Sequence, residues 1–382
     1  PCAHSLRDTA LVLFASIQGI FWVAVILLER VVDRAFLESS LFHKDLIFGD
    51  YTYVVRSATE TDVAIAGAHN PASLIHHLFE FLSKSLALGE NGVGLYLTAM
   101  VVFAAMPIFY SRRWFDLPQL FLAFVAFGPF SIAFLGSLDR GNSVGFIVPL
   151  LFFAGRAFLE NQMGKLTIWT VLLVLIKPQF IILIALFVIR KDFRNLLVAL
   201  GGVLVSQLLG FIVFWSHFPE NVWATFLFRG AYSTSVPLST DWPVNISIPR
   251  GIYQLLSVSG STFKGDLLPI LLAVGLVLVT VALFVINSTS NSPYVVFATM
   301  TVASAILVPV SWYYYSVFAL PLGLLMFHPK VLGNLGRSER GGGNIVPERV
   351  MVAAIALAIG YSLARFPLPG QYSITSQYSI AI

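Results

Sequence analysis

Residues 166–189 read LTIWTVLLVLIKPQFIILIALFVI, and this run decides how the chain is threaded. It has the length of one membrane-spanning helix, but Lys177 and Pro178 lie at its centre. A lysine in the middle of a spanning helix costs about 2.5–3.5 kcal/mol on insertion scales, and a proline there removes a helical hydrogen bond. Two short helices that meet at Lys177 avoid both costs. We therefore predict a re-entrant hairpin whose two ends lie on the same side of the membrane.

The rest of the chain is similarly apolar. Of its 382 residues, 57% are hydrophobic and 11% are charged, and the mean hydropathy is +0.84. Soluble domains carry about 25% charged residues, so the composition predicts an all-α polytopic membrane protein. Apolar runs recur from end to end, and we expect one domain over residues 1–382 with about 11 membrane helices. The first run, residues 9–28, is expected to be a retained helix and not a cleaved signal.

Several classes of protein and site are excluded. Cys2 is the only cysteine, which rules out disulfides within the chain and metal sites built on cysteine. The net charge of +4 is modest, and no block of like charges indicates a nucleic-acid partner. No Walker loop, Rossmann fingerprint or serine-nucleophile elbow is present. We expect neither a cofactor nor a metal.

Charge predicts the orientation. Two long loops, 29–91 and 216–265, interrupt the apolar runs, and the first contains an amphipathic stretch expected to lie along the membrane surface. The hairpin puts the N-terminus and most of the short connections on one side, and that side is net positive, while the other is net negative. The positive side includes 111–116, 156–165, 190–194 and 328–349. Cytoplasmic loops carry an excess of Lys and Arg, so both long loops are expected to face the extracytoplasmic side of the plasma membrane.

Five polar stretches are then expected on the outer face: Asp50, residues 139–142, Lys177, residues 245–250 and residues 311–315. Together they suit the binding of a polyprenyl-phosphate sugar. Its phosphate needs cations, its sugar needs aromatic and hydrogen-bonding partners, and an acceptor hydroxyl needs a base, for which Asp50 is the candidate. The candidates for the phosphate are Lys177, Arg140 and Arg250, and those for the sugar or acceptor are Trp312, Tyr313, Tyr314, Asn142, Asn245 and Trp242.

Each candidate also has an ordinary structural interpretation. Asp50 could cap a helix or pair with Arg56, and Arg140 could pair with Asp139 in a turn. Trp312 and the tyrosines after it could form an interfacial aromatic belt. The function has alternatives too: a transporter or flippase of a lipid-linked sugar also needs a cationic cavity and broken helices, and a lipid-binding subunit would perform no chemistry.

A set of short motifs in a fixed order resembles glycosyltransferase family 87. The motifs are Gly49-Asp50-Tyr51-Thr52-Tyr53-Val54, Arg140-Gly141-Asn142-Ser143, Leu175-Ile176-Lys177-Pro178, Asn245-Ile246-Ser247 and Val308-Pro309-Val310-Ser311-Trp312. They cover nearly the whole chain. Each motif is weak by itself, and their common order carries the resemblance.

The resemblance implies a GT-C-type helical bundle and an inverting mannosyl- or arabinofuranosyltransferase of the actinobacterial cell envelope. The donor would be a polyprenyl-phosphate sugar, and the acceptor a hydroxyl of a glycolipid or glycan. Asp50 matches the family's catalytic aspartate, Lys177 its Lys-Pro motif and Trp312 its Ser-Trp motif. The chain departs from the family at His69-Asn70-Pro71, where Tyr-Pro-Pro is frequent, and at Tyr313-Tyr314-Tyr315, where histidine is frequent. The sugar and the acceptor therefore stay open.

Overall fold

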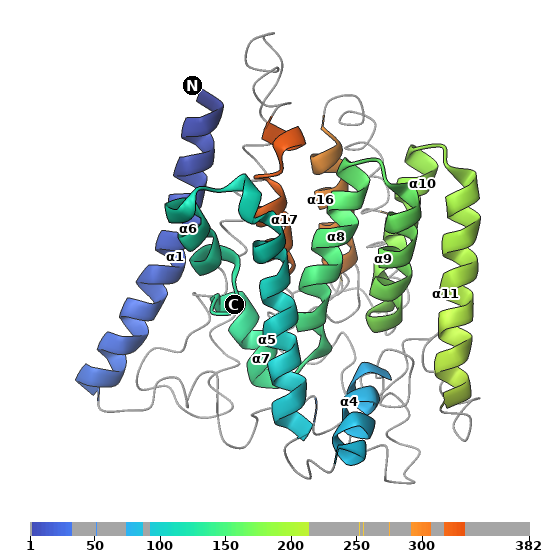
Figure 1. Ribbon diagram of the computed structural model, residues 1–382, viewed down its shortest axis with the longest axis horizontal. Helices are drawn as coiled ribbons and strands as arrows, with labels where there is room; N and C mark the ends of the chain where they lie inside the picture. The colour runs from blue at the N-terminus through green and yellow to red at the C-terminus, as the bar shows by residue number, and fades with distance from the viewer. Residues whose placement is uncertain are drawn as a thin grey trace.

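The computed structural model describes residues 2–32, 51, 74–86, 92–213, 252, 255, 275, 292–306 and 317–332. In these ranges every regular element is a helix, and there is no strand. The long helices stand side by side as a bundle (Figure 1). The all-α prediction is thus confirmed for the described part of the chain, while the number of membrane helices and the membrane location stay predictions.

Helix α1 (Cys2–Val32) packs against α6 (Leu117–Phe127) at one edge of the bundle (Figure 1). Phe14 meets Phe127 edge to face, with ring centroids 5.6 Å apart. Near the start of both helices, Gln119 Nε2 donates a hydrogen bond to Asp8 Oδ1 at 3.0 Å. The N-terminus and the start of α6 therefore lie at the same end of the bundle.

Helix α5 (Gly92–Ser111) is followed by the 3₁₀ turn η4 (Arg112–Trp114) and then by α6. The sequence predicts a single helix over 117–138 with a kink at Gly128-Pro129. The structure corrects this to two helices, because α6 stops at Phe127 and α7 begins separately (Ile132–Arg140). Gly128 is extended (φ −81°, ψ −178°), and a Cβ at this position would collide with the Phe124 carbonyl oxygen. Pro129 has no N–H with which to continue the helix.

The centre of the chain contains η5 (Ser143–Phe146), α8 (Ile147–Leu159), α9 (Met163–Ile176), η6 (Pro178–Ile184), α10 (Ala185–Ile189) and α11 (Phe193–Val213). The chain reverses direction between α9 and η6. Lys177 is extended there (φ −142°, ψ 102°), and Pro178 opens η6. The residue before a proline is biased towards the extended conformation, so the Lys-Pro pair ends α9 by local sterics.

The two ends of the segment 163–189 meet at one end of the bundle. Thr167 Oγ1 near the start of α9 lies 3.5 Å from Asn195 Oδ1 near the start of α11. The Arg190 guanidinium lies 4.6 Å from the ring centroid of Phe158, near the end of α8. The segment therefore enters and leaves on the same side, as the sequence predicts, and its position in a membrane stays a prediction.

The turns at this end are alike. In the turn after α8, Gln162 N donates to Ala157 O, and in the turn after α10, Asp192 N donates to Phe187 O, each at 2.8–2.9 Å. This bond pattern is the Schellman closure, which needs a left-handed residue and favours glycine there. The left-handed residues are instead Asn161 (φ 61°) and Lys191 (φ 55°).

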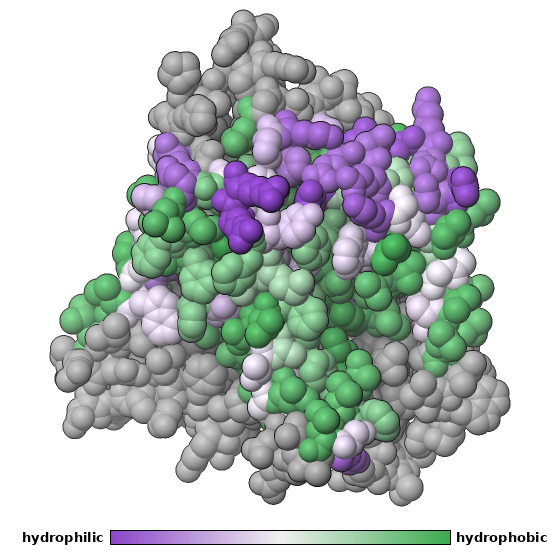
Figure 2. Space-filling model, viewed as in Figure 1, coloured by the Kyte–Doolittle hydropathy of each residue, from purple (hydrophilic) through white to green (hydrophobic). Residues whose placement is uncertain are grey.

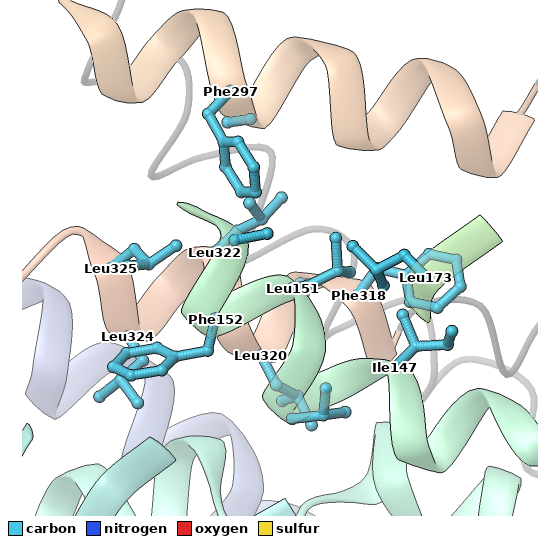
Figure 3. Close-up of a cluster of buried hydrophobic side chains, with 14 of the residues drawn as sticks. Ile147, Leu151, Phe152, Leu173, Phe297, Phe318, Leu320, Leu322, Leu324 and Leu325 are labelled. Carbon is cyan, nitrogen blue, oxygen red and sulfur yellow. The ribbon is translucent and has the colours of Figure 1, made fainter. Parts of the chain in front are cut away.

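The core lies between α8, α16 (Pro293–Ile306) and α17 (Ala319–Leu325). Figure 3 shows Phe297 of α16 directed towards leucines of α17. Gly155 of α8 permits this approach, because a Cβ there would lie 2.6 Å from Phe297 Cε1 and would also meet Leu325. Tyr294 fixes the contact between α16 and α17 by donating its hydroxyl proton to the Leu322 carbonyl at 2.9 Å.

Large apolar side chains remain exposed on the outside of the bundle. On α11 the exposed fractions reach 68% at Leu197 and 61% at Leu204, and on α5 they reach 63% at Phe109. Figure 2 shows a wide apolar region below a band of hydrophilic side chains. One helical stretch in the described ranges, Gly92–Trp114, is long and apolar enough to cross a membrane by length and composition. Exposed apolar surface of this extent is unusual for a soluble monomer.

Candidate functional site

Only part of the predicted site belongs to the described residues. Lys177 and Asn142 are described in full, and Arg140 is the last residue of α7, with its side chain outside the described set. The predicted residues that lie outside it altogether are Asp50, Trp242, Asn245, Arg250, Trp312, Tyr313 and Tyr314. The described part of the predicted site therefore consists of the elements that carry Asn142, Lys177 and Tyr51, the residue after Asp50.

Asn142 is held by the fold. Gly141 ends α7 in the left-handed region (φ 63°), and Asn142 N donates to Ser137 O at 3.0 Å. The Asn142 side-chain oxygen accepts a hydrogen bond from Val144 N at 3.1 Å and so caps η5. The residue is 7% exposed. The structure gives this oxygen a capping role, and a sugar-binding role for Asn142 stays a prediction.

Lys177 stands at the reversal between α9 and η6. Its N–H donates to Leu173 O at 2.8 Å, closing α9, and its carbonyl accepts from Phe180 N at 3.1 Å, opening η6. Both backbone groups are therefore fixed by hydrogen bonds. The side chain is partly exposed.

Asn142 and Lys177 lie at the same end of the bundle. Helices α8 and α9 are antiparallel neighbours joined by the turn 160–162, and each is about 20 Å long by the helical rise per residue. Asn142 precedes α8 through η5, and Lys177 follows α9. The start of α8 and the end of α9 therefore place Asn142 and Lys177 at the same end of the bundle.

Tyr51, the residue after Asp50, is 4% exposed. Its ring lies 4.7 Å from that of Tyr96 in α5, and Tyr96 lies 5.3 Å from Phe146 of η5. Phe79 of α4 (Leu74–Ser85) contacts both Tyr96 and Phe146, at 5.3 and 5.6 Å. These four rings, called here the aromatic anchor, attach the first long loop to the elements beside Asn142. The aromatic character of the stretch around Asp50 was the only sequence signal for this contact.

The opposite end of the bundle is cationic. The exposed cations there include Arg112, Arg113, Lys165, Arg190, Lys191, Arg194 and Lys330. Figure 2 shows the hydrophilic band that they help to form, over the turns that join α8 to α9 and α10 to α11. The connections predicted to lie on the positive side of the membrane therefore lie together at this end of the bundle, as far as their residues are described.

A polar cluster that the sequence did not indicate lies at this cationic end. Glu160 Oε1 accepts from Arg156 Nε at 2.7 Å, and His328 Nε2 is 3.4 Å from the same oxygen. His328 Nδ1 accepts from Lys330 N at 3.2 Å, so the ring is neutral with its proton on Nε2, which donates to Glu160. The cluster ties the end of α8 to the segment after α17.

The two titratable groups of this cluster have lowered pKa values. Burial lowers the pKa of His328 more than the nearby Glu160 carboxylate raises it. Burial alone would raise the pKa of Glu160, but the hydrogen bond and charge of Arg156, helped by His328, lower it on balance. At neutral pH the cluster is therefore an Arg–Glu ion pair with a neutral imidazole.

Within the described part of the chain, some buried side-chain atoms have no hydrogen-bond partner. They include Ser131 Oγ, Ser137 Oγ, Thr170 Oγ1 and Gln179 Nε2. Buried polar groups without partners are rare in proteins, and Gln179 is two residues from Lys177. Sequence reasoning passed over Gln179, because a single glutamine carries no motif.

No group of three or more His, Cys, Asp or Glu in the described ranges is arranged to hold a metal ion. In comparisons with known proteins, no protein-family model, curated protein or solved structure matches the chain.

Proposed function

We propose that the chain is an inverting glycosyltransferase of the plasma membrane, with its active site at the end of the bundle that carries Lys177. The donor is a mannosyl or arabinofuranosyl polyprenyl phosphate, and the acceptor is a hydroxyl of a cell-envelope glycolipid or glycan. The observation that carries the proposal is the common end shared by Lys177, the Asn142 turn and the aromatic anchor, which contains the residue after Asp50.

The charge distribution supports the orientation. Among the described residues, Lys84 of α4 is an exposed cation at the Lys177 end, but the seven exposed cations named above lie at the opposite end. Cytoplasmic ends of membrane proteins are enriched in Lys and Arg. The Lys177 end then faces outward. The exposed leucines of α11 and the exposed aromatic residues of α5 meet lipid in this arrangement.

In the proposed reaction, Asp50 removes the proton from the acceptor hydroxyl. The acceptor oxygen attacks the anomeric carbon of the donor from the face opposite the phosphate, and the bond between that carbon and the phosphate oxygen breaks. The electron pair leaves with the polyprenyl phosphate, whose added negative charge Lys177 stabilises. A positioned general base contributes about 100-fold to 10,000-fold to the rate.

Purified protein in nanodiscs tests the proposal when it is supplied with polyprenyl-phosphate mannose or arabinofuranose and a glycolipid fraction as acceptor. Wild-type protein should transfer the sugar with inversion, and Asp50→Asn should lower turnover about 100-fold or more while it still binds the donor. Asp50→Glu, which keeps a carboxylate, should retain more activity than Asp50→Asn.

A different outcome favours the transporter alternative. If the wild-type protein transfers neither sugar but moves the lipid-linked sugar between leaflets of a proteoliposome, the transferase proposal is wrong. Unchanged transfer by Asp50→Asn would remove Asp50 from the mechanism.

A further inference from the structure

The amide nitrogen of Gln179 is buried and has no hydrogen-bond partner in the described part of the chain. A buried donor in this state has lost its bonds to water without gaining others, which is unfavourable. Gln179 follows Lys177 by two residues, at the start of η6. Gln179 therefore lies at the same chain reversal as Lys177.

The geometry of η6 places Gln179 at the margin between the interior and the surface. A 3₁₀ helix has three residues per turn, so residues three apart share a face. Phe180 and Leu183 form the buried face, each 0% exposed, and Phe180 meets Phe318 edge to face at 5.2 Å. Ile181 is 47% exposed. Gln179, on the third face, is partly exposed, although its nitrogen is not.

The amide can reach a ligand without movement of η6. The terminal torsion of a glutamine side chain has a broad energy profile, so the amide can rotate towards a ligand at little cost. The packing of Phe180 and Leu183 meanwhile keeps the backbone of η6 in place. The side chain is thus a donor on a fixed support.

We propose that Gln179 is a binding residue for the phosphate of the polyprenyl-phosphate donor, with its amide N–H donating to a phosphate oxygen beside the Lys177 ammonium. This inference rests on the proposed function, and it adds a second, uncharged phosphate contact to the lysine. A phosphate group has several acceptor oxygens and accepts from an amide and an ammonium at once. The buried N–H gains its missing partner when the donor binds.

Thr170 provides a matched control. Its hydroxyl oxygen is also buried without a partner, and the residue is 0% exposed. It lies on α9 about two turns, or roughly 10 Å, before Lys177. Thr170→Val removes an unpaired polar atom away from the reversal, just as Gln179→Met removes one at the reversal with little change in side-chain shape.

The experiment measures two properties of purified wild type, Gln179→Met, Gln179→Glu and Thr170→Val. The first is resistance to unfolding in detergent. The second is the affinity for undecaprenyl monophosphate, with neutral undecaprenol as the comparison, measured by native mass spectrometry. Gln179→Met and Thr170→Val should each be at least as stable as wild type, because each substitution removes an unsatisfied polar group.

The affinities should then separate the variants. Gln179→Met should bind undecaprenyl monophosphate about 10-fold more weakly, the usual effect of losing a hydrogen bond to a charged group. Gln179→Glu should bind it more weakly still, because its carboxylate repels the phosphate. Thr170→Val should bind it as wild type does, and binding of undecaprenol should be equal in all four proteins.

Other results would overturn the inference. Equal affinity of wild type and Gln179→Met for the phosphate lipid shows that the amide does not contact phosphate, as does a loss of equal size for undecaprenol. Failure of wild type to bind undecaprenyl monophosphate also refutes it. If the phosphate site behaves as expected but wild type transfers no sugar, the transferase proposal fails and the phosphate site stands. If wild type transfers sugar and Gln179→Met does so with unchanged kcat and KM, the assignment of Gln179 fails alone.

Discussion

Two adjacent glycines of α11 offer a direct test of how the reversed segment is packed. At Gly202 a Cβ would lie 2.8 Å from Val171 Cγ2 on α9, whereas at Gly201 it would have nothing within 4 Å. Carbon atoms pack best at about 3.5–4.0 Å, so Gly202→Ala requires a shift of roughly 1 Å. Val171 is β-branched and strongly prefers one rotamer in a helix, so the helices themselves must separate.

The size of the effect follows from comparing the two substitutions. Glycine to alanine inside a helix is worth about 0.8–1.0 kcal/mol in propensity, and this gain is common to both positions. Overpacking costs about 1–3 kcal/mol, and it applies only at Gly202. We therefore expect Gly202→Ala to be about 1–3 kcal/mol less stable than Gly201→Ala, and Gly201→Ala to be at least as stable as wild type.

Unfolding by denaturant in a fixed detergent measures this difference. Val171→Ala removes the clashing methyl groups, so it should restore much of the stability lost by Gly202→Ala, and the two substitutions should not be additive. If Gly202→Ala proves as stable as Gly201→Ala, α9 and α11 do not approach each other at Val171. The return of the chain after Lys177 would then differ from the arrangement described.

Three further predictions address the rest of the bundle. Asn142→Ala should lower the unfolding free energy by about 0.5–2 kcal/mol through loss of the η5 cap. Asn142→Asp should keep most of the wild-type stability, because aspartate also caps helices well. If Asn142→Ala is as stable as wild type, the capping role is refuted. Gly155→Ala should cost about 1–3 kcal/mol against Phe297, while Gly164→Ala, which has open space, should not, and the same denaturant titration distinguishes them. The pKa of His328 is lowered in the folded protein, so the stability contributed by the neutral His328 is present above the ordinary histidine pKa of about 6.5. This stability is lost as the pH falls through that value towards the folded pKa. Thermal unfolding between pH 7.5 and 5.5 should show the loss in wild type, and a His328→Gln variant should not show it.

Local sequence rules predicted the helix break within 166–189, because Lys177 and Pro178 disfavour a continuous helix through their effect on the adjacent backbone. The same rules predicted a kink at Gly128-Pro129 and missed the full break. They treat the glycine as a weak point of a continuous helix, whereas the approach of the Phe124 carbonyl excludes any side chain there. Steric facts of this kind depend on conformation and are not visible in composition.

For the candidate site, the sequence indicated residue types and did not indicate their contacts. Lys177 was identifiable from the cost of its charge in an apolar run. Asn142 was expected to bind a ligand, but its side-chain oxygen caps η5, because a short polar side chain has several partners within reach along the chain. The Glu160 and His328 contact joins residues that are far apart in sequence, and no periodicity indicates such a pair.

The reversal at Lys177 has a consequence for how the chain can vary. Because α9 starts and α10 ends at the same end of the bundle, the segment 163–189 does not carry the chain from one end of the bundle to the other. Helix α11 sets out from the side on which α8 finished. A chain that lost or gained such a unit would keep the orientation of every later helix. The segment that carries Lys177 can therefore be removed or duplicated without inverting the rest of the bundle.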